Sequence, residues 1–299
     1  MLHHVADGSH ARLRRRARAV PAIAALALAC DGITDPPLPT GAERFAPPPA
    51  YARWWTLTQA CSGLTGAFGA VQFYRLPGAN RVPVSTSDSA TAYWSQGSNR
   101  IVIAGDWAND GPTVRHEMLH ALLRGGGHIP EYFQGRCAGV VACPQRGCRD
   151  EGAPPATVPL DAPMLPVSSL DLTMEVLPGP TVARSGADRA ISLVVRATNP
   201  RPVPVRVALQ PTAGLTAPWV HGFGYRLVRV GQPLPVTDLM NSSLYGFVSV
   251  DSVTRVPFAA GETRMWVIDV LAYWYPAAEY LAVGIFNARQ VWTPLTVTP

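Results

Sequence analysis

Lysine is absent from this chain of 299 residues, so arginine supplies all 25 of its basic side chains. The absence coincides with 30 prolines and with abundant alanine and valine. We attribute this composition to codon usage in a GC-rich genome rather than to selection at any one site. Internal repeats are absent too, and beyond the N-terminal segment no apolar run reaches the roughly 20 residues that a transmembrane helix needs. The sequence therefore excludes a repeat protein and a multi-span helical membrane protein.

The first thirty residues have the features of an export signal. Five arginines cluster between Arg12 and Arg18, and the apolar segment Ala19–Ala29 follows. Eleven residues are too few to span a bilayer but suit the core of a signal peptide. The end of this segment, Ala-Leu-Ala-Cys at residues 27–30, resembles a bacterial lipobox. The resemblance implies cleavage before Cys30, lipidation of Cys30 and a membrane-anchored lipoprotein of the bacterial cell envelope. A plain secretory signal, which would give a secreted protein, and an uncleaved anchor are the alternatives.

Removal of this segment also changes the charge of the chain. Cleavage before Cys30 removes five of the 25 basic residues and one of the 20 acidic residues, which leaves 20 and 19. The basic pI of 9.1 therefore reflects the export signal. No basic cluster with interleaved aromatic residues remains, so we exclude nucleic acid as a partner. Residues 31–49 are rich in proline, which resists helix and sheet, so we predict an extended tether there.

The most informative motif is the HExxH pattern that runs from His116 through Glu117 to His120. It lies within residues 112–124, where apolar side chains recur at helical spacing. Two histidines at positions i and i+4 project from one face of a helix, close enough to share a metal ion. Glu117 follows the first histidine and can reach a water on that metal rather than the metal itself. The pattern therefore predicts a hydrolytic zinc site.

A catalytic zinc site has three protein ligands and one open position. The helix should end at Arg124, because the three glycines at residues 125–127 cannot sustain it and give the chain freedom to turn back. His128 follows at once, so we predict it as the third ligand beside the two histidines of the motif. Glu131 is the alternative third ligand.

This arrangement resembles the zincin metallopeptidases, and the third histidine after a glycine turn is most similar to the metzincin branch, whose pattern is HExxHxxGxxH. In this chain the gap between His120 and His128 is two residues longer. The run from Arg115 to Cys137 is similar to uncharacterised bacterial secreted proteins with a zincin core, and the resemblance covers roughly residues 50–150. The resemblance implies an α+β zincin-like catalytic domain over these residues, hydrolysis of peptide bonds and one Zn²⁺ per chain. It also implies a methionine turn beneath the metal, for which Met164 is the candidate.

The residues before the motif predict the elements that precede the metal helix in such a fold. A helix is predicted over Ala50–Leu64, and strands over Ala70–Tyr74, Thr91–Trp94 and Arg100–Ala104. Zincins present one edge of such a sheet to an extended substrate, which binds by adding a strand. Tyr93 or Tyr132 could hydrogen-bond an oxyanion there, and a place in the core or at the rim is the simpler interpretation of each.

Four cysteines follow Cys30, an even number that favours disulfides in an exported chain. Three pairings are possible. We predict that Cys61 pairs with Cys137, which would tie the first helix to the segment after the third histidine, and that Cys143 pairs with Cys148. A thiolate zinc site is the alternative, although the spacing lacks the close cysteine pairs that such sites use.

Residues 151–169 contain five prolines and show little periodicity, which predicts a linker. Beyond it, over residues 170–299, strands are predicted at Leu170–Leu177, Ala190–Ala197, Val203–Leu209, Gly224–Val230, Gly246–Val250, Thr263–Val270, Tyr280–Phe286 and Trp292–Val297. Seven or eight short strands at this spacing predict an all-β immunoglobulin-like sandwich. Its turns resemble those of bacterial Ig-like domains of the intracellular-proteinase-inhibitor type. Its one histidine, His221, is expected at the surface.

Together these patterns predict a zinc-dependent peptidase of the bacterial cell envelope. Glu117 would act as general base and then donate its proton to the leaving amine. The expected substrate is a peptide or protein, cut internally rather than at its ends, and the expected state is a monomer. Two alternatives remain, a non-catalytic zinc lipoprotein that acts as a binding module and a protease inhibitor that acts through the β domain. Arg115 is interpreted as an ion-pair or surface residue outside the chemistry.

Overall fold

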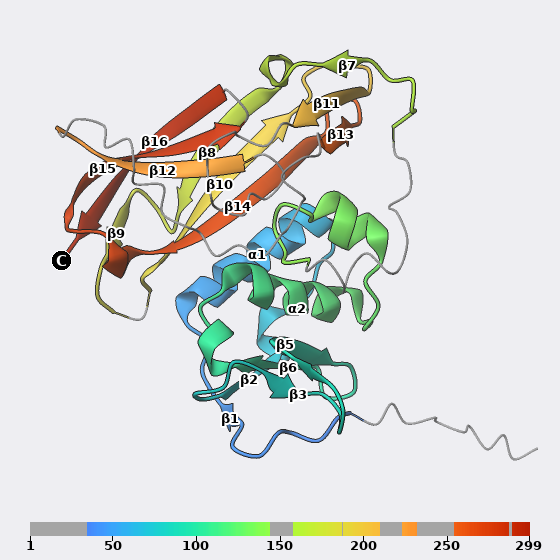
Figure 1. Cartoon of the computed structure of the whole chain (residues 1–299), viewed down its shortest axis with the longest axis vertical. Helices are drawn as coiled ribbons and strands as arrows, with labels where there is room; N and C mark the ends of the chain where they lie inside the picture. The colour runs from blue at the N-terminus through green and yellow to red at the C-terminus, as the bar shows by residue number, and fades with distance from the viewer. Residues whose placement is uncertain (1–34, 144–157, 187, 210–222, 232–253, 287–288) are drawn as a thin grey trace, which may run out of the picture. The chain divides into compact units, whose positions relative to one another are not determined.

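The first part of the protein contains a four-stranded sheet and two long helices in a computed structural model (Figure 1). The structure describes residues 35–143, 158–186, 188–209, 223–231, 254–286 and 289–299. The sheet has the order β1-β2-β6-β5, and these strands span Glu43–Arg44, Gln72–Leu76, Arg100–Ala104 and Ala92–Ser95. β2 and β6 are parallel and the other two pairs antiparallel, with β5 at one edge. The three strands predicted here are confirmed, with end shifts of at most two residues.

The helices α1 (Pro49–Ser62) and α2 (Gly111–Leu123) share a buried core with one face of this sheet. Proline at the first position of α1 suits a helix start, and Gly63 ends the helix with a left-handed φ of 72°. The carboxylate of Asp110 caps α2 by accepting a hydrogen bond from the backbone N–H of Thr113 at 3.0 Å. Both predicted helices are confirmed.

Several short elements lie between the long helices and strands of both parts. They are the hairpin of β3 (Val82–Pro83) and β4 (Ser89–Ala90), the 3₁₀ helices Phe68–Ala70, Gly105–Trp107, Val167–Ser169 and Ala272–Trp274, and a π-helix at Glu131–Arg136.

The described strands of the second part form three sheets. The first sheet has the order β14-β10-β8, with strands at Thr263–Leu271, Ala190–Thr198 and Asp171–Leu177. The second has the order β13-β11-β7, with strands at Thr254–Phe258, Val205–Leu209 and Met164–Leu165. The third has the order β12-β15-β16-β9, with strands at Phe223–Arg229, Ala278–Phe286, Arg289–Thr298 and Thr181–Ala183. Side chains from all three sheets meet in one buried core. Each strand predicted within the described residues of this part is present, and Gly246–Val250 lies outside them. The fold thus combines helices with several sheets, and the finer zincin-like and immunoglobulin-like assignments stay predictions.

The strands β10 and β14 are buried on both faces. Along β10, Ile191, Leu193 and Val195 join the core of the second part, whereas the alternate residues Ala190 and Val194 join the core that contains α1 and α2. β14 divides its side chains between the two cores in the same way. The two parts therefore share a hydrophobic core, and the described residues belong to one compact unit.

The predicted tether and linker both contain ordered structure where the structure describes them. Residues 35–49 include β1, and the N–H of Phe45 donates to the carbonyl of Phe73 at 3.1 Å. Residues 158–169 include β7, and Val167 is buried in the core of the second part. The predicted signal segment with Cys30, together with His221, lies outside the described residues. Within the described residues, no helix combines the length and the apolar character needed to cross a membrane.

Candidate metal centre

Two of the three predicted ligands lie on α2. His116 and His120 are one helical turn apart, so their side chains project from the same face of the helix. The apolar residues Val114, Met118 and Leu119 on the same helix are fully buried in the core shared with α1 and the sheet. Burial of this apolar stripe fixes the rotation of α2 and hence the direction of the two imidazoles.

The ε nitrogens of His116, His120 and His128 converge on one point. Nε2 of His116 lies 3.1 Å from Nε2 of His128 and 3.2 Å from Nε2 of His120. Three nitrogens bound tetrahedrally to zinc at roughly 2.05 Å would lie about 3.3 Å apart. The spacing therefore fits a single metal ion. Within the described part of the chain, these histidines form the one group of three or more potential ligands.

Backbone carbonyls orient two of these imidazoles. Nδ1 of His116 lies 2.6 Å from the carbonyl oxygen of Ala142, and Nδ1 of His120 lies 2.8 Å from that of Gly125. Because a carbonyl only accepts, each Nδ1 carries the hydrogen, and the lone pair stands on Nε2. Burial, with the nearby imidazoles of His120 and His128, holds the pKa of His116 well below its usual value. That histidine is therefore neutral, as a metal ligand must be.

The turn that returns His128 to the centre begins directly after α2. Arg124 adopts the left-handed conformation, with φ of 52°, whereas Gly125 and Gly126 do not. The helix therefore ends where the sequence predicts, and the chain turns back to His128 after the glycine tract. Gly125 contributes its carbonyl, which accepts the hydrogen bond from His120.

The alternative ligand and the two tyrosines have other partners. Glu131 forms an ion pair with Arg136 at 2.8 Å and does not belong to the ligand group. The guanidinium carbon of Arg136 also lies over the ring of Tyr132, 5.7 Å from the ring centroid. Tyr93 packs in a separate cluster with Val82 and two residues of β6, whereas its neighbours on β5 join the core beside α2. Tyr93 therefore points to the face of the sheet away from the centre, and its oxyanion role is wrong.

Glu117 is buried beside the histidines. Burial raises the pKa of its carboxyl to about 8, and a hydrogen bond from the backbone of Trp94 offsets part of this rise. Trp94 belongs to β5, the edge strand, so the carboxyl lies between the metal helix and the sheet edge. A carboxyl with a pKa near neutrality can both accept and release a proton under physiological conditions.

Phe133, which no local sequence pattern distinguishes from the other aromatic residues, forms the floor of the centre. The three imidazole centroids are 4.9 to 5.0 Å apart, and each lies 4.9 to 5.0 Å from the Phe133 ring centroid. The four rings thus form a nearly regular tetrahedron. The phenyl ring is fully buried and packs against all three imidazoles of the histidine triangle. Met164, the predicted methionine beneath the metal, lies in β7 and is 46% exposed, so that prediction is wrong.

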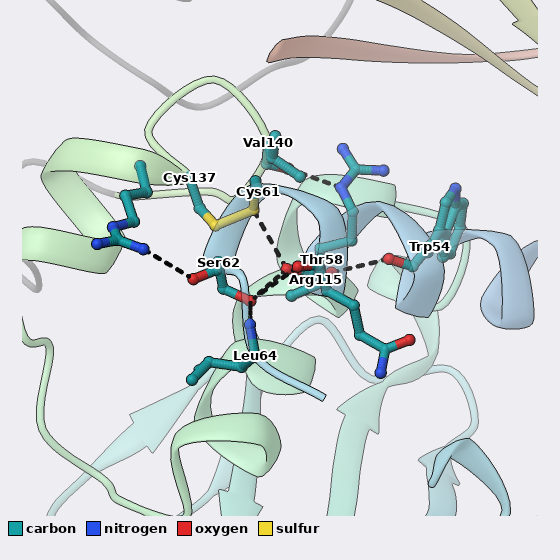
Figure 2. Close-up of a disulfide and its surroundings, with 10 residues drawn as sticks. Trp54, Thr58, Cys61, Ser62, Leu64, Arg115, Cys137 and Val140 are labelled. Carbon is teal, nitrogen blue, oxygen red and sulfur yellow. Dashed lines mark hydrogen bonds between the residues drawn. A yellow bond between two sulfur atoms is a disulfide. The ribbon is translucent and has the colours of Figure 1, made fainter. Parts of the chain in front are cut away.

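A disulfide holds this floor against the first helix. Figure 2 shows the bond between Cys61, at the end of α1, and Cys137, directly after the π-helix that carries Phe133. The predicted pairing of these two cysteines is confirmed. Cys143 is also disulfide-bonded. Cys148 lies outside the described residues, so the second predicted pairing is not tested. A thiolate metal site that uses Cys61, Cys137 or Cys143 is wrong for this structure.

Comparison with known proteins gives no relative from which a function could be transferred. No protein-family model matches the chain, and no curated protein matches it significantly. The function is therefore inferred from the geometry of the centre itself.

Proposed function

We propose that the protein is a zinc-dependent peptidase in which His116, His120 and His128 bind the metal. The observation that carries the proposal is the convergence of three imidazole Nε2 atoms beside a buried glutamate. Neutral imidazole nitrogens in a three-ligand set are typical of catalytic zinc, and a fourth position stays open for water or substrate. When bound, zinc supplies Lewis acidity, which activates a water molecule and polarises a carbonyl group.

Glu117 moves the proton in this proposal. It accepts one proton from the water whose oxygen forms the new bond to the carbonyl carbon. It then gives that proton to the amine nitrogen as the carbon–nitrogen bond breaks, so the carboxylate is restored at the end of the cycle. Burial raises the pKa of Glu117 to about 8 in the metal-free protein, and a cation held by the histidines would lower this pKa. A purely structural metal site would have no need of this buried base.

The edge strand supports an extended peptide as the substrate. β5 ends the four-stranded sheet, and its Trp94 hydrogen-bonds Glu117 through the backbone. A peptide that pairs with this edge as an added strand would pass next to the base and the metal centre. Strand addition engages the main chain in the middle of a substrate, which favours internal cleavage over removal of terminal residues.

The location in the bacterial cell envelope is proposed from the sequence alone. The basic cluster, the short apolar segment and Cys30 together favour export and lipid anchoring. In that location the disulfides described above would be stable, since exported compartments are oxidising.

Cleavage of a quenched-fluorescent peptide library by the purified protein tests the proposal. Hydrolysis should stop when a chelator removes the metal and return when zinc is restored. Glu117→Gln should abolish hydrolysis while zinc stays bound, because the amide cannot take a proton. Glu131→Gln is the matched control, since that glutamate forms an ion pair outside the ligand group, and it should keep most activity. Zinc binding without cleavage of any peptide would favour the alternative of a non-catalytic binding module.

A further inference from the structure

A buried ion pair joins the metal helix to the second part of the protein. Arg115, directly before His116 in α2, has a fully buried side chain, and its Nη1 lies 2.6 Å from Oδ2 of Asp269 in β14. The Asp269 side chain is only 7% exposed. Either charge left alone in this environment would be strongly unfavourable, so each constrains the position of the other.

Further contacts fix Asp269 itself. Its Oδ1 accepts hydrogen bonds from Nε1 of Trp54 in α1 at 2.9 Å and from Oγ of Ser192 in β10 at 2.6 Å. A Cβ atom added to Gly111, the first residue of α2, would lie 2.1 Å from Oδ2 of Asp269. The start of the metal helix therefore approaches this carboxylate as closely as a glycine allows.

The same arginine reaches the segment that orients a metal ligand. Nε of Arg115 donates to the carbonyl oxygen of Val140 at 2.6 Å, a bond drawn in Figure 2. Two residues later, the carbonyl of Ala142 accepts the hydrogen bond from Nδ1 of His116 at 2.6 Å, and the N–H of Ala142 donates to the carbonyl of Pro112 at 2.9 Å. Arg115 and His116 are adjacent in α2, and both hydrogen-bond the short segment Val140–Ala142.

β14 also holds the start of that segment through its backbone. The N–H of Val267 donates to the carbonyl of Gly139 at 2.9 Å. A Cβ atom added to Gly139 would lie 2.5 Å from the carbonyl oxygen of Met265, so the segment lies against β14 at a distance that favours glycine. Residues 139–142 are therefore held between β14 on one side and α2 on the other.

We propose that Asp269 is a positioning residue for the metal centre. Through Arg115 it fixes both the helix that carries His116 and the carbonyl that orients the imidazole of His116. The planar guanidinium sets the directions of its hydrogen bonds to Asp269 and Val140 together, which a single ammonium group cannot do. The second part of the protein then helps to position the metal ligands and is not a separate accessory module. This inference rests on the proposed metallopeptidase function, because the geometry that Asp269 maintains is that of three ligands on one ion.

A second ion pair across the same interface provides a matched control. The guanidinium of Arg53 in α1 contacts both carboxylate oxygens of Asp188, at 2.6 and 2.7 Å, and also donates to the carbonyl of Ala190. These hydrogen bonds join α1 to the second part, and their acceptors lie outside α2 and outside residues 139–142. Loss of this pair should weaken the interface without moving His116.

The test measures zinc affinity and the visible absorption spectrum of the cobalt-substituted protein. Asp269→Asn should weaken zinc binding by about 10-fold or more, which is the usual range when support for a metal ligand is lost, and should change the cobalt spectrum. Arg115→Lys should do the same while it keeps the buried charge, so it covers the case in which Asp269→Asn does not fold. Asp188→Asn should keep both the affinity and the spectrum of the wild type.

The outcomes separate this inference from the function on which it rests. An unchanged affinity and spectrum in Arg115→Lys, or an equal change in Asp188→Asn, would overturn the role of Asp269. Wild-type protein that binds zinc but cleaves no peptide would refute the peptidase and leave the positioning role supported by the metal measurements. Wild-type protein that binds neither zinc nor cobalt would overturn both.

Discussion

Loss of the disulfide between Cys61 and Cys137 should destabilise the protein by about 4 kcal/mol. The bond joins residues 76 positions apart. The chain-entropy relation gives roughly 4.5 kcal/mol at 25 °C for a loop of this length, and the measured losses for native disulfides are typically about 2–5 kcal/mol. In a chain of this size each kcal/mol lowers the melting temperature by about 2–4 °C. The expected fall is therefore about 8–16 °C.

The same loss should also loosen the metal centre. Cys137 directly follows the π-helix that carries Phe133, so without the bond the floor beneath the three imidazoles is less restrained and zinc affinity should fall. Calorimetry of Cys61→Ala, of Cys137→Ala and of the double variant checks the reasoning. Either single change breaks the same crosslink, so each should lose nearly as much stability as the double variant. Additive losses, or a fall of less than about 3 °C in the double variant, would refute it.

Four further predictions concern single side chains. His128→Ala should lose most of the bound zinc whereas Glu131→Ala should keep it, and metal analysis that gave the reverse would reassign the third ligand. Phe133→Ala should destabilise the protein by about 3–5 kcal/mol and weaken zinc binding. Phe133→Leu should keep more of the stability and more of the zinc affinity. An alanine variant with wild-type zinc affinity would contradict the role given to the phenyl ring. The metal-free protein should lose stability in urea unfolding as the pH rises from neutral through the folded pKa of Glu117, about 8. Stability falls in this direction because a carboxyl with a raised folded pKa favours the folded state only while it stays protonated. The loss of stability should be absent from Glu117→Gln. An equal loss in that variant would show that another group causes it. Cys30→Ser should move the protein out of the detergent phase, and a mature N-terminus at another residue, with no acyl mass, would contradict lipidation of Cys30.

Local patterns predicted most of the helices and strands. The metal helix, expected over residues 112–124, spans Gly111–Leu123, and the strand expected at Arg100–Ala104 has those same bounds. Both predictions depend on properties that lie within a few residues, namely hydrophobic periodicity and the residues that end a helix. The three histidines were found for the same reason, because their spacing along the chain is short.

Contacts between distant segments could not be predicted in this way. Phe133 is one aromatic among many in the sequence, and only the return of the chain after His128 brings it beneath the imidazoles. The partner of Arg115 is 154 residues away in β14. One signal was present: Asp269 interrupts the apolar run from Met265 to Leu271. A near-continuous apolar strand indicates burial on both faces, and a carboxylate within it needs a buried partner.

X-ray absorption at the zinc edge of the purified protein tests the central claim most directly. Three imidazole nitrogens from His116, His120 and His128 and one further light atom should give a first shell near 2.0–2.1 Å, with the outer-shell scattering typical of imidazole rings and one zinc per chain. The zinc that His128→Ala retains should give a spectrum with one imidazole fewer. A shell near 2.3 Å, which indicates sulfur ligands, or a spectrum unchanged by the loss of His128, would contradict the three-histidine site.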